Sequence, residues 1–101
     1  MNIEEQSGIN MQLIAFAGSA KSCFVEAVDE ALDGNIAEAE KLMAEGKESF
    51  TQAHQAHFKL LQEAAKGELE VDLLSVHAQC QLMSAEDMQL IAEKVIARLK
   101  K

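Results

Sequence analysis

Apolar residues recur at intervals of three and four along nearly the whole chain, which is the spacing of one face of an α-helix. The pattern predicts a first helix over about residues 3–32 (or 9–32), a second over 36–65 and a third over 69–99. Strands would show as short alternating runs rich in Val, Ile and Thr between turn residues, and no such run stands out. The sequence therefore predicts an all-α protein.

Two short connections separate the predicted helices. Asp33-Gly34-Asn35 ends the first helix, because Gly34 suits the left-handed conformation after a helix end. Asn35 can cap the second helix, with Glu38 three residues on as in a capping box. Lys66-Gly67 ends the second helix in the same manner. Short connections between long helices predict a three-helix antiparallel, up-down-up bundle forming a single domain over residues 1–101.

Two glycines lie inside predicted helices. Gly18 interrupts the first helix, and we expect it to mark the close approach of another helix. Gly46 interrupts the second and is either a bend or a tolerated glycine. Helix-forming residues resume at once after it, so we expect a continuous helix.

The third predicted helix carries more apolar surface than one bundle can bury. Its inner stripe comprises Leu74, Ala78, Leu82, Ala85, Ala92, Ile96 and Leu99. Val76, Met83 and Leu90 recur every seven residues on another side. A second exposed stripe indicates self-association through this helix. A closed ring is favoured over an open chain, and the pattern leaves dimer and trimer both open.

Composition and charge exclude several classes of function. The formal net charge is −8, which argues against nucleic-acid binding and against a basic membrane-surface helix. No apolar run approaches the roughly 20 residues of a membrane span, and the acidic N-terminus is not a signal peptide. Cys23 and Cys80 fall in predicted helices rather than in a loop framework. We therefore expect free thiols and a cytoplasmic protein without membrane insertion.

His77 is the candidate for chemistry. It lies at the flank of the inner stripe, with Cys80 and Gln81 one turn later and Ser84 two turns later. A titratable imidazole and small polar groups thus share a mostly apolar surface. The alternative interpretation is a core histidine whose hydrogen bonds are satisfied.

Four segments together resemble enzyme IIA of the lactose/cellobiose (N,N'-diacetylchitobiose) class of the phosphoenolpyruvate-dependent sugar phosphotransferase system. The similarity covers nearly the whole chain. The segments are Ala15-Phe16-Ala17-Gly18-Ser19-Ala20-Lys21-Ser22, the turn from Asp33 to Ala39, Gln52-Ala53-His54, and Val76-His77-Ala78-Gln79-Cys80-Gln81-Leu82-Met83. The last lies on the family signature His-(Gly/Ala)-Gln-Asp-His-Leu-Met.

The resemblance implies a homotrimer of nine helices and a phosphohistidine carrier with His77 as the catalytic residue. Such a carrier takes a phosphoryl group from HPr and passes it to enzyme IIB during uptake of a β-glucoside-type or lactose-type disaccharide. Which sugar is not readable from the chain. Gln81 could supply a hydrogen-bond donor to the phosphoryl group or a contact that orients His77, and a neighbouring subunit's second helix is the other source.

The chain departs from the family pattern at four clustered positions, Cys80, Gln81, His57 and Phe58. In relatives an Asp at the place of Cys80 points to the threefold axis, where three copies hold a metal ion. Three neutral thiols need no cation, so we expect no Mg²⁺ and no metal or other cofactor. The alternative is a thiolate zinc site. We expect His57 to be a polar neighbour of His77 that attracts the phosphoryl group when protonated, with a non-catalytic wall residue as the alternative.

Two other functions remain open. The clustered departures suit a diverged, non-catalytic trimeric paralogue with a regulatory or scaffolding role. Without the resemblance, a helical bundle that binds metal through His54, His57, His77 and Cys80 is a third reading.

Overall fold

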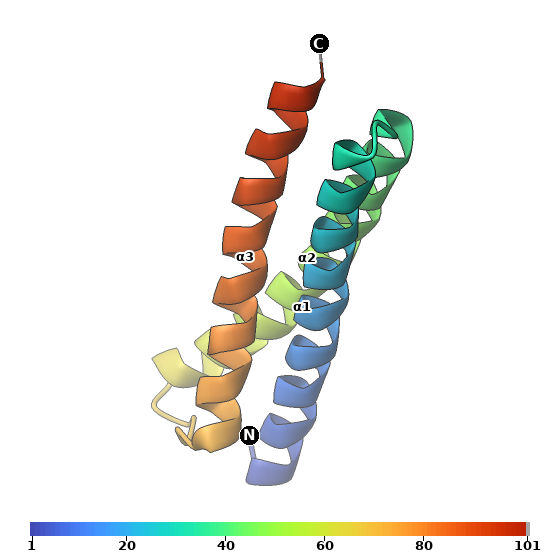
Figure 1. Ribbon diagram of the computed structural model, residues 1–101. Coiled ribbons are helices and arrows are strands. Elements are labelled where there is room, and N and C mark those ends of the chain that lie inside the picture. Colours follow the sequence, from blue (N-terminus) through green and yellow to red (C-terminus); the bar gives the residue numbers. More distant parts are fainter. Residues whose placement is uncertain (101) are drawn as a thin grey trace.

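The computed structural model describes residues 1–100 and contains three long helices. They are α1 (Ile3–Leu32), α2 (Ile36–Ala65) and α3 (Leu73–Leu99), which run up, down and up (Figure 1). The prediction of an all-α chain with three helices is confirmed for this part of the chain, where no strand occurs. None of the helices in residues 1–100 combines the length and apolar character that a membrane crossing requires.

The turn between α1 and α2 forms largely as its sequence indicates. Gly34 adopts φ +86° and follows the end of α1, and Gly67 adopts φ +73° after α2. The predicted capping box is wrong, because the Asn35 side chain makes no cap hydrogen bond. Its Nδ2 instead donates to Glu30 Oε2 at 2.8 Å, back across the turn.

The start of α3 differs from the prediction. The helix begins at Leu73, not at Leu69, and residues 68–72 form a non-helical connection. Asp72 caps α3, because its Oδ1 accepts from the Ser75 backbone N–H at 2.9 Å. The apolar residues Leu69 and Val71 lie four and three residues before Leu73 and Leu74, so they extend the apolar helical spacing of α3 to positions before its true start. This explains the error. Leu69 packs against the core from this connection.

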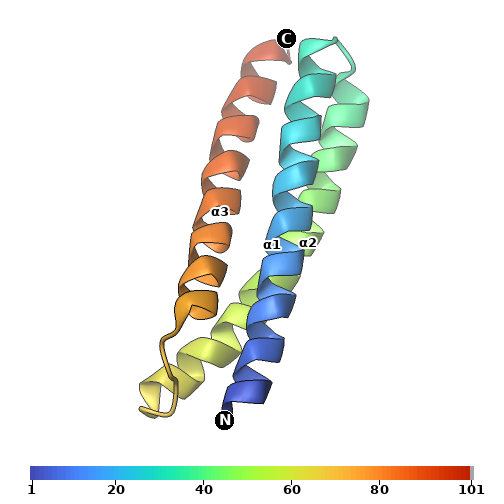
Figure 2. The same cartoon turned by 60° about the horizontal axis from the view of Figure 1, so that its bottom comes forward.

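Helix α1 lies at the centre of the bundle. It packs along both other helices, whereas α2 and α3 make little contact with each other. Both views show the C-terminal half of α2 crossing obliquely towards the start of α3 (Figures 1 and 2). The shared core is rich in alanine, which lets the helices approach closely, and includes Leu13, Phe24, Phe50, Leu60, Leu82 and Ile96. One face of α3 is thus left uncovered by the rest of the chain.

The close helix approach is at Gly46, not at Gly18. A Cβ on Gly18 would meet nothing within 4 Å. A Cβ on Gly46 would lie 2.5 and 2.8 Å from ring atoms of Phe24 and 3.1 Å from the Cys23 Cβ. Helix α2 continues through Gly46 without interruption, as expected. This glycine therefore admits the Phe24 ring between α1 and α2.

Gly46→Ala is expected to destabilise the protein although alanine favours helix. The Phe24 ring is fully buried and packs edge-on against Phe50, with ring centroids 6.3 Å apart, so it cannot swing away freely. Overpacking of this kind costs about 1–3 kcal/mol, more than the roughly 1 kcal/mol gained from helix propensity. Urea unfolding monitored by circular dichroism measures the difference.

Gly8→Ala is the matched control for this change. Gly8 lies in α1 and a Cβ there would meet nothing within 4 Å. The variant should be as stable as the wild type or more stable, by up to about 1 kcal/mol. A Gly46→Ala protein that gains as much stability as Gly8→Ala would contradict the packing at Gly46.

Candidate functional site

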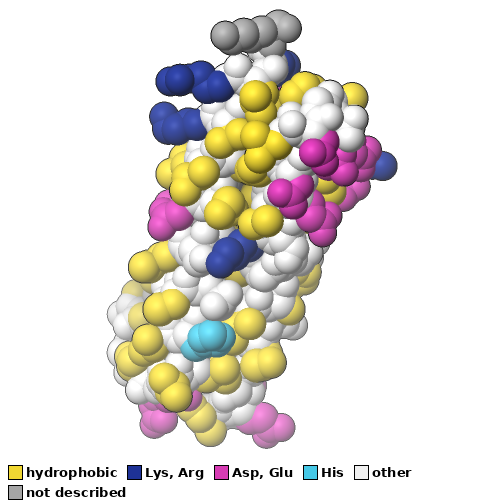
Figure 3. Space-filling model, in the orientation of Figure 1, with side chains coloured by type: hydrophobic (Ala, Val, Ile, Leu, Met, Phe, Trp, Pro, Cys, Tyr) yellow, Lys and Arg dark blue, Asp and Glu magenta, His cyan; other side chains and the backbone are white. Residues whose placement is uncertain are grey.

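His77 is an exposed residue in the second turn of α3. The neighbouring Ala78 is fully buried in the shared core, so this turn is packed on its inner side and the imidazole lies outside. The alternative of a core histidine is therefore wrong. The space-filling view shows hydrophobic side chains scattered over this face of the molecule (Figure 3).

The residues that follow His77 by one and two turns remain beside it on the helix. Gln81 and Ser84 are half-buried, and Cys80 is exposed. Their spacing places Gln81 and Ser84 on the same flank of α3 as His77. On this flank the imidazole of His77 can act as a nucleophile that accepts a transferred group. The amide of Gln81 and the hydroxyl of Ser84 can form hydrogen bonds around it.

His57 is a residue of α2 and contacts the flank of α3 opposite to His77. Its Nε2 donates to Gln79 Oε1 at 3.0 Å, which links α2 to α3. Gln79 is about 160° around the helix from His77, since each residue turns by about 100°. The expected pairing of His57 with His77 is thus absent within one chain. Gln79 was missed as a site residue, although it is part of the signature segment.

His54 faces an open hollow on α2. Its ring packs on Phe50 with centroids 4.4 Å apart. The hollow has a volume of about 410 Å³, and its lining consists of Thr51, His54, Gln55, His57, Phe58 and Leu61. Phe58 and Leu61 are 60% and 51% exposed, so this part of α2 presents an apolar surface next to the His57–Gln79 hydrogen bond.

An apolar stripe follows the uncovered face of α3. We call it the α3 seam, and it consists of Leu73, Val76, Cys80, Met83 and Leu90. Its large hydrophobic members are between 47% and 84% exposed. The exposure expected for Val76, Met83 and Leu90 is confirmed. Asp87 and Lys94 continue the same spacing of three and four residues towards the C-terminus.

The candidate metal ligands do not converge in one chain. Within residues 1–100 no three side chains of His, Cys, Asp or Glu come together as a metal-binding group. His54, His57, His77 and Cys80 therefore do not form a site in a single protomer. Both cysteines are free thiols, and burial raises the pKa of the half-buried Cys23.

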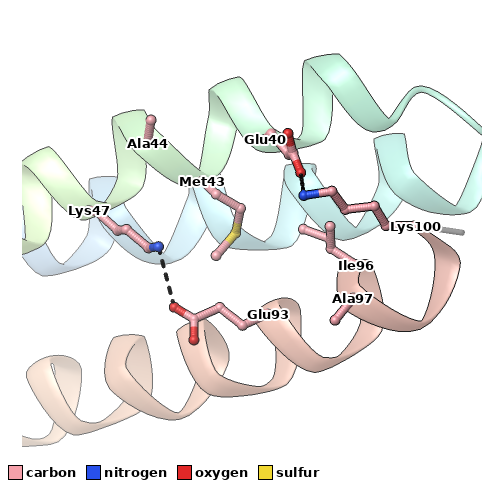
Figure 4. A pocket seen from close by; sticks show the side chains of 8 residues that line it. All are labelled: Glu40, Met43, Ala44, Lys47, Glu93, Ile96, Ala97 and Lys100. Carbon is pink, nitrogen blue, oxygen red and sulfur yellow. Dashed lines mark ion pairs between the residues drawn. The ribbon is translucent and has the colours of Figure 1, made fainter.

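A second opening separates α2 from α3 near the other end of the bundle. It has a volume of about 380 Å³ and an apolar floor that includes Met43 and Ile96 (Figure 4). Lys47 Nζ lies 3.6 Å from Glu93 Oε1 across it, and Lys100 pairs with Glu40. Glu93 is 16 residues beyond His77, roughly 24 Å along the helix. This opening is thus separate from the candidate site.

Comparison with known families and structures agrees with this geometry. A protein-family model described as "PTS system, Lactose/Cellobiose specific IIA subunit" matches residues 8–100. The crystal structure of PtcA from S. mutans is similar with a TM-score of 0.95 and 34% identity, and the match covers both chains completely. The cellobiose-specific enzyme IIA of Bacillus anthracis is similar with a TM-score of 0.89 and 38% identity, over 99% of this chain and 91% of that one.

Curated relatives extend over the same length. The lactose-specific EIIA component of Staphylococcus epidermidis is 32% identical over 100% of this chain and 98% of its own. The lichenan-specific phosphotransferase enzyme IIA component of Bacillus subtilis is 35% identical over 97% of this chain and 90% of its own.

Proposed function

Because this chain belongs to the lactose/cellobiose-specific IIA family of the phosphoenolpyruvate-dependent sugar phosphotransferase system, we propose that it is a phosphohistidine carrier with His77 as the acceptor. It receives the phosphoryl group from HPr and passes it to enzyme IIB in the cytoplasm, during uptake of a β-glucoside-type or lactose-type disaccharide. The observation that carries the proposal is the exposed imidazole in the matched signature segment.

The chemistry needs little from this protein. A neutral imidazole is nucleophilic near pH 7, and as the leaving group of a phosphoramidate it departs readily. In the first step an N–P bond to His77 forms as the N–P bond to the donor breaks, and the second step reverses the roles. Both steps depend on in-line positioning and on donors to the phosphoryl oxygens. An exposed side chain suits an acceptor that two partner proteins must reach in turn.

A closed trimer would complete the site. If three α3 seams meet on a common axis, one flank of each α3 faces the opposite flank of the next copy. His77 then lies beside Gln79 and His57 of a neighbouring chain. Protonated His57 would attract the phosphoryl group there, and Gln81 would donate to it from the same chain as His77. The exposed apolar residues of the seam support this assembly, since a monomer would leave them in water.

No step of this mechanism uses a metal. The resemblance implies a cation held on the axis by three carboxylates, and this chain has Cys80 in that place. Neutral thiols are poor ligands for a hard cation such as Mg²⁺. The donor set therefore does not fit the implied ion, and we propose an apolar thiol layer at the axis instead.

The clustered departures at His57, Phe58, Cys80 and Gln81 favour one alternative. A diverged trimeric paralogue would keep the bundle and its protein contacts and would act as a regulatory or scaffolding partner. Such a protein would bind enzyme IIB without transferring phosphate.

Radiolabelled phosphoenolpyruvate with enzyme I and HPr tests the proposal. The wild-type protein should take up close to one phosphoryl group per chain, in an acid-labile, alkali-stable linkage, and release it to enzyme IIB. Omitting HPr is the control and should prevent labelling. A folded protein that stays unlabelled but still binds enzyme IIB would favour the non-catalytic alternative.

A further inference from the structure

Two polar side chains are buried in the first turns of α1 where apolar ones would be expected. Gln6 is 1% exposed and Asn10 is fully buried. Buried amides are costly unless they are hydrogen-bonded, so each needs partners in the protein. Gln6 bonds to Glu70 in the connection before α3, and Asn10 Nδ2 donates to Ser75 in α3 itself, more than sixty residues further along the chain. Asn10 Oδ1 is left without a hydrogen-bond partner within residues 1–100.

Gln6 holds the connection between α2 and α3. Its Oε1 accepts from the Glu70 backbone N–H at 3.1 Å, and its Nε2 donates to the Glu70 carbonyl. The Gln6 side-chain amide thus pairs with both the backbone N–H and the backbone C=O of Glu70, as a residue of a neighbouring β-strand would. The connection has no helix of its own at this point, and this pair fixes its path against α1.

Ser75 receives the second set of contacts. Its Oγ accepts from Asn10 Nδ2 at 3.2 Å and lies 3.3 Å from Gln6 Nε2. The same hydroxyl donates to Asp72 Oδ1 at 2.7 Å, and the Ser75 backbone N–H donates to that oxygen at 2.9 Å. These hydrogen bonds lower the pKa of Asp72. We call Gln6, Asn10, Asp72 and Ser75 the Ser75 network.

We propose that the Ser75 network positions His77 for phosphoryl transfer. This rests on the function proposed above. Ser75 is only two residues before His77, and the first turn of a helix lacks intrahelical partners for its N–H groups and frays readily. The network anchors that turn to α1 through directional hydrogen bonds. Apolar contacts alone would allow α3 to shift along α1. Gln6, Asn10 and Ser75 are therefore positioning residues that act through the backbone of α3.

The isosteric pair Ser75→Val and Ser75→Thr tests the proposal, because only threonine keeps the hydroxyl. Ser75→Val should slow phosphoryl transfer to His77 about tenfold while the final labelling per chain stays complete, since misplacement of a reacting group lowers rate rather than capacity. Ser75→Thr should restore the rate to within about twofold of the wild type. The same two changes at Ser49, whose hydroxyl pairs with Ser19 at 3.3 Å far from His77, serve as controls.

Hydrogen exchange separates positioning from general stability. In Ser75→Val, exchange should accelerate at the amides of residues 73–80 and remain unchanged along α2. Equal transfer rates for Ser75→Val and the wild type would overturn the proposal, as would equal slowing by valine and threonine or faster exchange throughout the bundle. If the wild type takes no label, the proposed function fails, and unchanged exchange at residues 73–80 would then refute the anchoring as well.

Discussion

His77→Ala is expected to abolish phosphoryl uptake completely. In the proposed mechanism the imidazole itself carries the phosphoryl group, so no neighbouring group can replace it, and Gln81 and Ser84 lack the nucleophilicity of a neutral imidazole. The fold should survive, because His77 is exposed and surface substitutions usually change stability by less than about 0.5 kcal/mol. The measurement is the labelling assay with phosphoenolpyruvate, enzyme I and HPr, together with a thermal melt of the same preparation.

The other two histidines provide the matched controls for this variant. His54→Ala should label at the wild-type rate, since the ring packs on Phe50 in the hollow of α2. His57→Ala should label fully but several-fold more slowly, if His57 of the neighbouring copy attracts the phosphoryl group. Labelling that persists in His77→Ala and disappears in His54→Ala or His57→Ala would assign the acceptor to another residue and refute the proposed site.

Charges placed in the α3 seam are expected to convert the proposed trimer into monomers. Met83 and Leu90 are 59% and 54% exposed, and burying each side chain in an assembly is worth about 1.5–3 kcal/mol. Met83→Glu combined with Leu90→Glu removes this gain in every copy and brings like charges together on the axis. The dissociation constant should rise by more than about 100-fold. Sedimentation equilibrium measures the mass of both proteins.

Leu32→Glu is the control for the seam. Leu32 is 63% exposed and lies at the end of α1, so the variant adds one glutamate charge per chain, against two in the seam variant, and leaves the seam unchanged. This variant should keep the mass of the wild type. A wild-type protein that is monomeric at micromolar concentration, or a seam variant that remains trimeric, would refute assembly through α3.

The parts of the fold that follow from neighbouring residues could be predicted from the sequence. The α1–α2 turn depends on Asp33 and Gly34, and the bounds of α2 were predicted correctly for that reason. The start of α3 was placed four residues too early. The sequence feature that marks the true start of α3 is Asp72, an N-cap residue with Ser75 three positions later. The apolar spacing of Leu69 and Val71 obscured it. The hydrogen bonds between Gln6 and Glu70 join residues 64 positions apart, so no short sequence pattern indicates them.

In the candidate site too, the features set by neighbouring residues could be predicted and the long-range contacts could not. The exposure of His77 follows from its angle on the helix relative to Ala78 and Leu82, and the signature segment identifies it. The hydrogen bond between His57 and Gln79 depends on where α2 crosses towards α3. That crossing is set by the bundle as a whole, including the packing of Phe24 over Gly46. No pattern within either helix could have indicated it.

The central place of α1 has a consequence for the order in which the chain matures. Helices α1 and α2 are joined by a short turn and touch over their length, so they can pair while the ribosome is still adding the remainder. Helix α3 makes few contacts with α2 and packs mainly on α1, whose first turns were synthesised some seventy residues earlier. Helix α3 is therefore the last of the three helices to dock, and a nascent chain presents His77 on a folded surface only after α3 has been synthesised.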